Sequence, residues 1–114
     1  MMNDWNAYRE ALLDRVGDIA KQSPDVVRGL TTIDGAAAKT GHLEPKIHEL
    51  IALAVAVTTR CDGCISVHTK KAVEHGATLP EITEALGVAI ALNAGAALTY
   101  SARVIEAHAQ LTNA

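Results

Sequence analysis

Aromatic side chains are nearly absent from this chain: they make up 3 % of its 114 residues, and phenylalanine does not occur at all. Alanine, by contrast, accounts for close to a fifth of the sequence. A core of small side chains buries little apolar surface per residue, but it lets helices approach one another closely. The composition therefore favours helix packing that continues from one subunit to the next, with packing inside a monomer as the alternative.

Concentrated positive charge is also missing. The formal net charge is −3, the isoelectric point is near 5.9, and no basic cluster exceeds the pair Lys70-Lys71. Because nucleic-acid binding usually requires a concentrated basic surface, we expect no nucleic-acid partner. The first residues, Met1 to Asn6, lack the basic start and apolar core of a signal peptide, which predicts a cytoplasmic protein.

No apolar run is long enough to suggest a membrane span. The most apolar stretch, Leu86 to Leu98, contains Gly87, Asn93 and Gly95, and it is shorter than the ~20 residues that cross a bilayer. We therefore expect no membrane partner, and we interpret this stretch as a buried helix pair or as an interface.

The sequence shows no alternating strand pattern, whereas helix start and stop signals are frequent. We predict an all-α protein, a compact bundle of about six helices that forms a single domain over residues 1–114. The helix at Lys46–Arg60 is apolar on all sides in its middle and should be central. The expected helices run from Asn3 or Asp4 to about Ile19, from Ser23-Pro24 to Gly41, from Glu44-Pro45 to Arg60, from Cys61 or Asp62 to His75, from Thr78-Leu79-Pro80-Glu81 to about Asn93-Ala94-Gly95, and from Leu98 to about His108.

Cysteine occurs only twice, and Cys61 and Cys64 stand two residues apart. In a reducing compartment such a C-x-x-C pair is more often catalytic, redox-sensing or metal-binding than a structural link. At a helix start, unpaired N–H groups and the positive end of the helix dipole favour the reactive thiolate. The pair predicts thiol redox chemistry, with two small buried apolar residues as the alternative. By this reasoning alone Cys61, nearest the helix terminus, is the preferred nucleophile.

Two side chains suited to proton transfer flank the cysteines. His68 lies four residues after Cys64 on the same helical face, and Glu49 precedes Cys61 with eleven residues between them. Glu49 is either exposed or held in an apolar setting, and in the second case it becomes a usable proton acceptor and donor. His48 points about 100° away around the helix, so it is a weaker candidate.

The arrangement Glu49-(eleven)-Cys61-x-x-Cys64-x-x-x-His68 resembles the motif of the AhpD-like alkylhydroperoxidases within the carboxymuconolactone decarboxylase family. The similarity extends over roughly residues 24 to 98. It includes His48-Glu49-Leu50-Ile51-Ala52-Leu53-Ala54-Val55-Ala56-Val57, Cys64-Ile65-x-x-His68-x-x-x-Ala72 and the segment carrying Leu79-Pro80-Glu81, Glu84 and Ala85.

This resemblance implies an all-α domain that assembles into trimers or, in short single-domain members, into hexamers. It implies that Cys64 attacks a hydroperoxide, that Cys61 converts the resulting sulfenic acid to a disulfide, and that Glu49 and His68 relay protons. The activity would be that of an antioxidant peroxidase acting on organic hydroperoxides or hydrogen peroxide, with no cofactor or metal. A dithiol, or a lipoyl-type or thioredoxin-like protein, would be its reductant.

One position departs from the family pattern. The well-studied hydroperoxidases carry a further histidine just before the second cysteine, where this chain has Gly63. A slower reductase, a disulfide-exchange role or an unknown substrate are therefore alternatives. The others are the lyase that gives the family its name, which does not need paired cysteines; a zinc module built on Cys61, Cys64 and His68; and a non-catalytic oligomeric scaffold that senses redox state.

Overall fold

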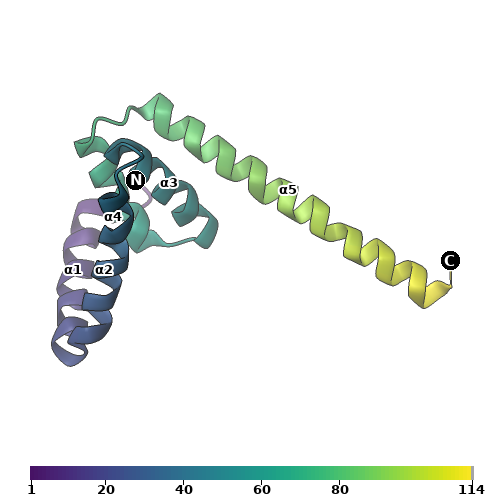
Figure 1. Cartoon of the computed structure of the whole chain (residues 1–114), viewed down its shortest axis with the longest axis horizontal. Coiled ribbons are helices and arrows are strands. Elements are labelled where there is room, and N and C mark those ends of the chain that lie inside the picture. Colours follow the sequence, from purple (N-terminus) through teal and green to yellow (C-terminus); the bar gives the residue numbers. More distant parts are fainter. Residues whose placement is uncertain (114) are drawn as a thin grey trace.

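Five α-helices make up the computed structural model, which describes residues 1–113 (Figure 1). They are α1 (Trp5–Gln22), α2 (Pro24–Thr40), α3 (Pro45–Thr59), α4 (Asp62–Glu74) and α5 (Leu79–Thr112). No β-strand occurs in residues 1–113, so the predicted all-α class is confirmed. α3 packs against α4 and α5, while α1 packs against α2 and α4, and α4 is therefore in contact with both α1 and α3.

Local signals in the sequence explain where most of the helices begin and end. Asp4 caps α1, with Oδ1 accepting a hydrogen bond from the N–H of Ala7 at 3.1 Å. Ser23 occupies the expected N-cap position of α2, although its side chain makes no capping hydrogen bond. Gly41 ends α2 at a φ of 71°, a left-handed conformation that glycine adopts without steric cost. At the start of α5, Thr78 and Glu81 form the expected capping box.

The last two predicted helices are one. α5 runs without interruption for 34 residues, so the molecule has five helices where about six were expected, and the predicted break at Asn93-Ala94-Gly95 is wrong. Asn93 does not leave the helix, because its side-chain amide donates to Thr58 Oγ1 at 2.9 Å and to the carbonyl of Ala89 at 2.8 Å. A single glycine costs a helix only about 1 kcal/mol relative to alanine, and the surrounding alanines and leucines favour helix.

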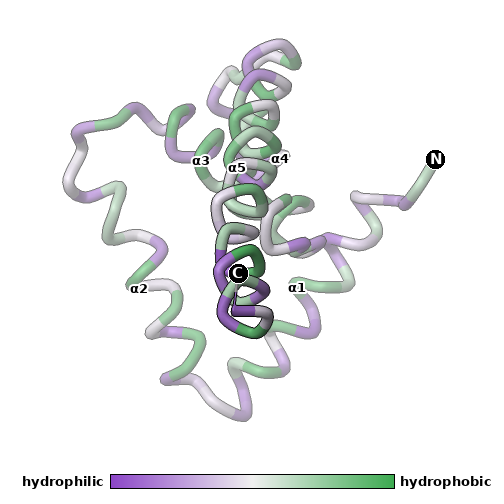
Figure 2. The backbone as a smooth tube through the Cα atoms, turned by 90° about the vertical axis from the view of Figure 1, so that its right-hand side faces the viewer, coloured by the Kyte–Doolittle hydropathy of each residue, from purple (hydrophilic) through white to green (hydrophobic). Residues whose placement is uncertain are grey.

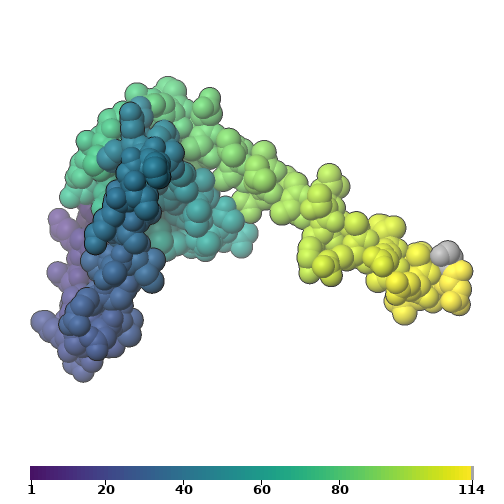
Figure 3. Space-filling model, in the orientation of Figure 1, coloured from purple at the N-terminus to yellow at the C-terminus, as the bar shows by residue number. Residues whose placement is uncertain are grey.

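The single chain is more extended than the expected compact bundle. Its radius of gyration is 18.9 Å, compared with about 13 Å for a compact domain of this length. Figures 1 and 3 show α5 projecting as a rod beyond the other helices, and Figure 2 shows α1 and α2 diverging as a V. A helix of this length rises about 50 Å, which is too long for the rest of the chain to cover. The single domain over residues 1–114 stays a prediction, and Ala114 lies outside the described residues.

The apolar core is small. In residues 1–113 it consists of Leu53, Ala56, Ala72 and Ala89, and no large side chain is fully buried. The first two belong to α3, in agreement with its predicted central place. Large apolar side chains lie exposed instead along α2 and α5. They include Val26, Leu30 and Ile33 on α2, and Val88, Ile90, Leu92, Leu98, Val104 and Ile105 on α5.

In the described part of the chain, α5 is the one helix that is long and apolar enough to cross a membrane, judged by length and composition alone. Only 6 % of its most apolar 18-residue segment is buried. The stretch Leu86–Leu98 therefore belongs to one helix and is not a helix pair, and Ala89 is its only buried residue. Of the two interpretations made from the sequence, only that of an interface stays a prediction.

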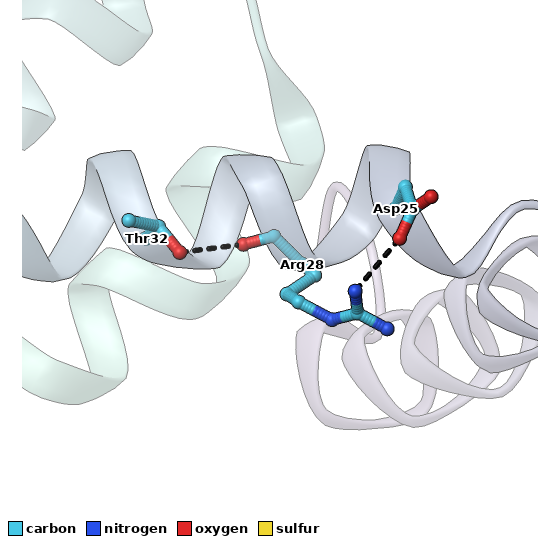
Figure 4. Close-up of polar contacts among 3 residues, drawn as sticks. All are labelled: Asp25, Arg28 and Thr32. Carbon is cyan, nitrogen blue, oxygen red and sulfur yellow. Dashed lines mark hydrogen bonds and ion pairs between the residues drawn. The ribbon is translucent and has the colours of Figure 1, made fainter.

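The polar contacts on α2 are local. Arg28 Nη1 pairs with Asp25 Oδ1 at 2.7 Å, and Thr32 Oγ1 donates to the backbone carbonyl of Arg28 at 2.9 Å (Figure 4). Each contact joins residues three or four apart in one helix, and exposed pairs of this kind contribute little stability. α2 buries none of its residues, and it packs against α1.

Candidate active site

The two cysteines lie at a sharp turn between α3 and α4. α3 ends at Arg60, whose φ of 54° and ψ of 48° are left-handed, a conformation that is uncommon for residues other than glycine. The N–H of Cys61 donates to the carbonyl of Ala56 at 3.0 Å, which closes the helix end. The chain therefore reverses within a few residues, and Cys61 becomes the N-cap of α4.

Cys61 and Cys64 are joined by a disulfide, with their Cα atoms 5.2 Å apart. The N–H of Cys64 donates to Cys61 Sγ at 3.1 Å, so one of the unpaired amides at the helix start already points at a sulfur. Both cysteines are half-buried. The structure thus places the pair at a helix N-terminus, as the sequence predicts, with a helix amide available to a Cys61 thiolate.

Glu49 and His68 form a contact across two helices. Glu49 Oε2 on α3 lies 2.7 Å from His68 Nδ1 on α4, and their side chains are 12 % and 20 % exposed. Of the two settings that the sequence left open for Glu49, the structure has the largely buried one. When the carboxylate is ionised, Nδ1 carries the proton and donates it, so Nε2 is left as the second site for proton exchange.

His68 is hydrogen-bonded to Glu49 but not to the sulfur of either cysteine. Within residues 1–113, no hydrogen bond connects the His68 ring with Cys61 or Cys64, although His68 follows Cys64 by four residues on the same helix. The four predicted residues therefore form two pairs, the disulfide and the carboxylate–imidazole pair, separated along α4 by one helical turn.

The carboxylate–imidazole pair faces a cavity between α2, α3 and α4. The cavity measures about 430 Å³, and Leu43, Ile51 and several alanines supply its apolar lining. Its polar lining is Asp34, His48, Glu49, His68 and Lys71. A cavity that combines apolar walls with a proton-transfer pair is typical of a small-molecule site.

A second cavity, of about 550 Å³, also includes Glu49 and His48. His42 and His75 line it as well. No pattern in the sequence singles out these two histidines or Lys71, because His42 lies in a loop and His75 caps the end of α4, the helix that also carries Lys71. Among residues 1–113, no three histidine, cysteine or acidic side chains are grouped closely enough to hold a metal ion.

α1 explains the glycine between the cysteines. A Cβ atom added to Gly63 would stand 2.9 Å from Leu12 Cδ2, which is closer than carbon atoms pack. A larger side chain at this position would require the end of the Leu12 side chain to shift.

Comparisons with known proteins give relatives along most of the chain. The model of the carboxymuconolactone decarboxylase family matches residues 24–107. An uncharacterized protein of Haemophilus influenzae is 47 % identical over 108 residues, which cover 95 % of this chain and 96 % of that protein. Uncharacterized protein 4 in the cox locus of Paracoccus denitrificans is 31 % identical over 90 residues, covering 79 % and 81 %. A carboxymuconolactone decarboxylase family protein from Legionella pneumophila, crystallised in its apo form, has a TM-score of 0.73 and 34 % identity, covering 90 % and 92 %.

Proposed function

Because the chain belongs to the carboxymuconolactone decarboxylase family, we propose that it is an AhpD-like peroxidase that reduces organic hydroperoxides or hydrogen peroxide through a Cys61–Cys64 dithiol/disulfide cycle. The observation that carries this proposal is the disulfide at the N-terminus of α4 with a carboxylate–imidazole pair one turn further along the same helix. In its reduced dithiol form the cysteine pair supplies two electrons per cycle, and the carboxylate–imidazole pair supplies a path for protons.

The cycle begins when His68 takes the proton of the Cys64 thiol at Nε2, which leaves Cys64 as a thiolate. Its sulfur attacks the distal oxygen of the hydroperoxide, the O–O bond breaks, and the sulfenic acid of Cys64 forms. The departing alkoxide takes a proton from His68, which Glu49 holds in place by the 2.7 Å contact at Nδ1. The products are an alcohol, or water when the substrate is hydrogen peroxide, and an oxidised enzyme.

Cys61 then closes the disulfide. Its sulfur attacks Cys64 Sγ, the S–O bond breaks, and the hydroxyl leaves as water with a proton returned through the same pair. The Cα separation of 5.2 Å already suits this bond. We assign the first attack to Cys64 because His68 is one turn from it and two turns from Cys61. Once the disulfide opens, the N–H of Cys64 favours the thiolate form of Cys61.

A dithiol must reopen the disulfide to complete the cycle. One thiolate of the reductant attacks a sulfur of the pair, its second thiol releases the protein thiol, and the two cysteines regain two electrons and two protons. We propose that a dithiol, or a lipoyl-type or thioredoxin-like protein of the cytoplasm, does this. Half-burial of both cysteines is compatible with such access.

We further propose that the enzyme works as a homo-oligomer, a trimer or a hexamer. The chain exposes 8769 Å² of surface, whereas a compact protein of 12.0 kDa exposes roughly 6,000 Å². The difference, roughly 2,800 Å², is in the range that obligate oligomers bury. The exposed apolar faces of α2 and α5 would supply it, and a second copy of this chain carries the same faces.

The experiment that tests the proposed activity follows free thiols in reduced protein during exposure to cumene hydroperoxide and to hydrogen peroxide. We expect rapid loss of two thiols per chain and a mass decrease of about two hydrogens, because the only new bond is the disulfide. The variant with both cysteines replaced by serine is the blank. Thiols that react no faster than free cysteine would refute peroxidase activity.

A further inference from the structure

α1 lies against the first turn of α4, the turn that holds the two cysteines. Leu12 of α1 approaches Gly63 so closely that a Cβ added there would stand 2.9 Å from Leu12 Cδ2. Leu12 and Gly63 are both half-buried. The peptide segment enclosed by the disulfide is therefore covered on one side by a side chain from a helix 50 residues away in the sequence.

Ser66 continues this contact along α4. It is the only buried polar residue in the described part of the chain, with 3 % of its surface exposed. Its Oγ donates to the carbonyl of Gly63 at 2.8 Å, and its own carbonyl accepts a hydrogen bond from Arg9 Nη1 at 3.2 Å. The other terminal nitrogen of Arg9 donates to Asn6 Oδ1 at 2.6 Å, which fixes the guanidinium in this position. We call Arg9, Leu12, Gly63 and Ser66 the α1 clamp.

The clamp acts on a segment that would otherwise be free to change its shape. Gly63 has the widest backbone freedom of any residue type, and a disulfide requires Cα atoms within about 4.4 to 6.8 Å of each other. In the oxidised protein the disulfide itself holds the turn. In the reduced protein the packing of the turn, together with its backbone hydrogen bond from the N–H of Ile65 to the carbonyl of Cys61 at 3.0 Å, keeps the two sulfurs close.

We propose that Arg9, Leu12 and Ser66 are positioning residues that set the disulfide–dithiol equilibrium of Cys61 and Cys64. By restricting the Gly63 turn, the clamp raises the effective concentration of one thiol at the other and so favours the closed bond. This inference deepens the proposed function and rests on it in one respect: the bond must open and close. It requires no peroxide.

The equilibrium is measured against dithiothreitol, which passes two electrons and two protons to the cysteines while its own two sulfurs form a cyclic disulfide. The reduced and oxidised proteins are counted by intact mass after alkylation of free thiols. Ser66→Ala removes only the hydroxyl that holds the Gly63 carbonyl. Leu12→Ala removes the side chain that covers the turn. Ser101→Ala is the matched control, because Ser101 Oγ donates to the carbonyl of Ala97 at 2.6 Å on an exposed stretch of α5.

We expect both clamp variants to shift the equilibrium toward the dithiol by about tenfold, which is about 30 mV for a two-electron couple, while Ser101→Ala leaves it unchanged. Loosening the clamp gives freedom to the reduced turn and little to the oxidised turn, which the disulfide still restrains. An equilibrium in both clamp variants that equals the wild-type value would overturn the proposal.

Unfolding in urea separates positioning from general stability. If the clamp positions the cysteines, Ser66→Ala destabilises the oxidised protein more than the reduced protein, by the same factor as the shift in the disulfide equilibrium, because the two measurements close a thermodynamic cycle. Equal destabilisation of both forms would make Ser66 merely structural. If either variant fails to fold, Arg9→Met tests the same shift at the edge of the clamp.

The outcome is independent of peroxidase activity. A wild-type protein that equilibrates with dithiothreitol but does not react with hydroperoxides would refute the proposed peroxidase. The equilibria of the variants would still test the clamp. A peroxidase whose equilibrium does not respond to Leu12→Ala and Ser66→Ala would refute the clamp alone.

Discussion

Glu49 and His68, nineteen residues apart in the chain, meet at 2.7 Å between Oε2 and Nδ1. The contact joins α3 to α4 beside the turn that carries the cysteines, and both side chains are largely buried. A carboxylate in this position fixes the orientation and tautomer of an imidazole. The pair therefore has the arrangement of a general acid–base.

Replacing each cysteine in turn distinguishes their roles. Cys64→Ser should abolish consumption of cumene hydroperoxide, because it removes the attacking sulfur. Cys61→Ser should allow a single turnover and leave a sulfenic acid on Cys64, since no second thiol can condense with it. Trapping with dimedone followed by mass spectrometry detects that acid. Should the trapped acid appear on Cys61 in the Cys64→Ser variant instead, the order of attack is the reverse.

Glu49→Gln should slow the reaction of the reduced enzyme with hydroperoxide by roughly 100-fold at neutral pH, the lower end of what a positioned proton-transfer group contributes. The amide keeps the size of the side chain but removes the carboxylate that accepts the hydrogen bond of His68 Nδ1 and orients the ring. The rate is measured by stopped-flow loss of thiol.

Glu10→Gln on α1 is the matched control, because Glu10 is exposed. A Glu49→Gln enzyme with a wild-type rate would assign Glu49 a purely structural role. Far-ultraviolet circular dichroism at both redox states establishes that the variant is folded.

The left-handed Arg60 makes the α3–α4 turn sensitive to residue type. Arg60→Val should destabilise the protein by about 1 kcal/mol or more, because a β-branched side chain is poorly tolerated at positive φ. Arg60→Gly should be at least as stable as the wild type, since glycine adopts the observed φ of 54° without steric cost. Urea unfolding midpoints of the oxidised proteins compare the two. A glycine variant that is as unstable as the valine variant would show that the guanidinium, rather than the backbone, holds the turn.

The stability that Glu81 contributes at the start of α5 should decrease in acid. Lys46 Nζ on α3 pairs with Glu81 Oε2 at 2.7 Å, and hydrogen bonds from Lys46 and from Thr78 lower the pKa of the Glu81 carboxyl to about 2. A carboxyl whose pKa is depressed on folding stabilises the folded state above its unfolded pKa, ordinarily near 4.5, and that stabilisation is lost as the pH falls toward 2.

The stability of the wild type should therefore exceed that of Glu81→Gln above pH 4.5, and the two should converge between pH 4.5 and about 2. Thermal unfolding across this range measures the difference. Lys46→Met, which keeps the capping box, should lose only the part due to the ion pair. A constant difference between wild type and Glu81→Gln over the whole range would contradict this assignment.

Exposed apolar residues on α5 should hold the subunits together. Leu98 and Ile105 are 75 % and 72 % exposed in the single chain, and Leu98→Glu or Ile105→Glu would place a charge in the proposed interface. We expect sedimentation velocity to report a trimer or hexamer for the wild type and a smaller species for these variants. Glu106→Gln, at an exposed position of the same helix, is the control. A monomeric wild type that partitions into lipid vesicles would reject the oligomer and favour a membrane for α5.

The sequence by itself determined most of the helix ends and the place of the cysteines. The caps at Asp4 and Gly41, the box of Thr78 and Glu81, and the N-cap position of Cys61 all involve residues within four positions of each other. Interactions of this range depend mainly on neighbouring residues, so the spacing of residue types predicts most of them. The spacing of Cys64 and His68 on one helical face belongs to the same class.

Only the tertiary structure decided what lies opposite these residues. Burial of Glu49, its contact with His68, and the approach of Leu12 to Gly63 join segments 19 or more residues apart, and no local pattern encodes such distances. The continuity of α5 was decided in the same way, because Asn93 is held by Thr58 of α3. Helix starts and stops depend on local hydrogen bonds, whereas burial and pairing depend on which faces meet when the helices pack.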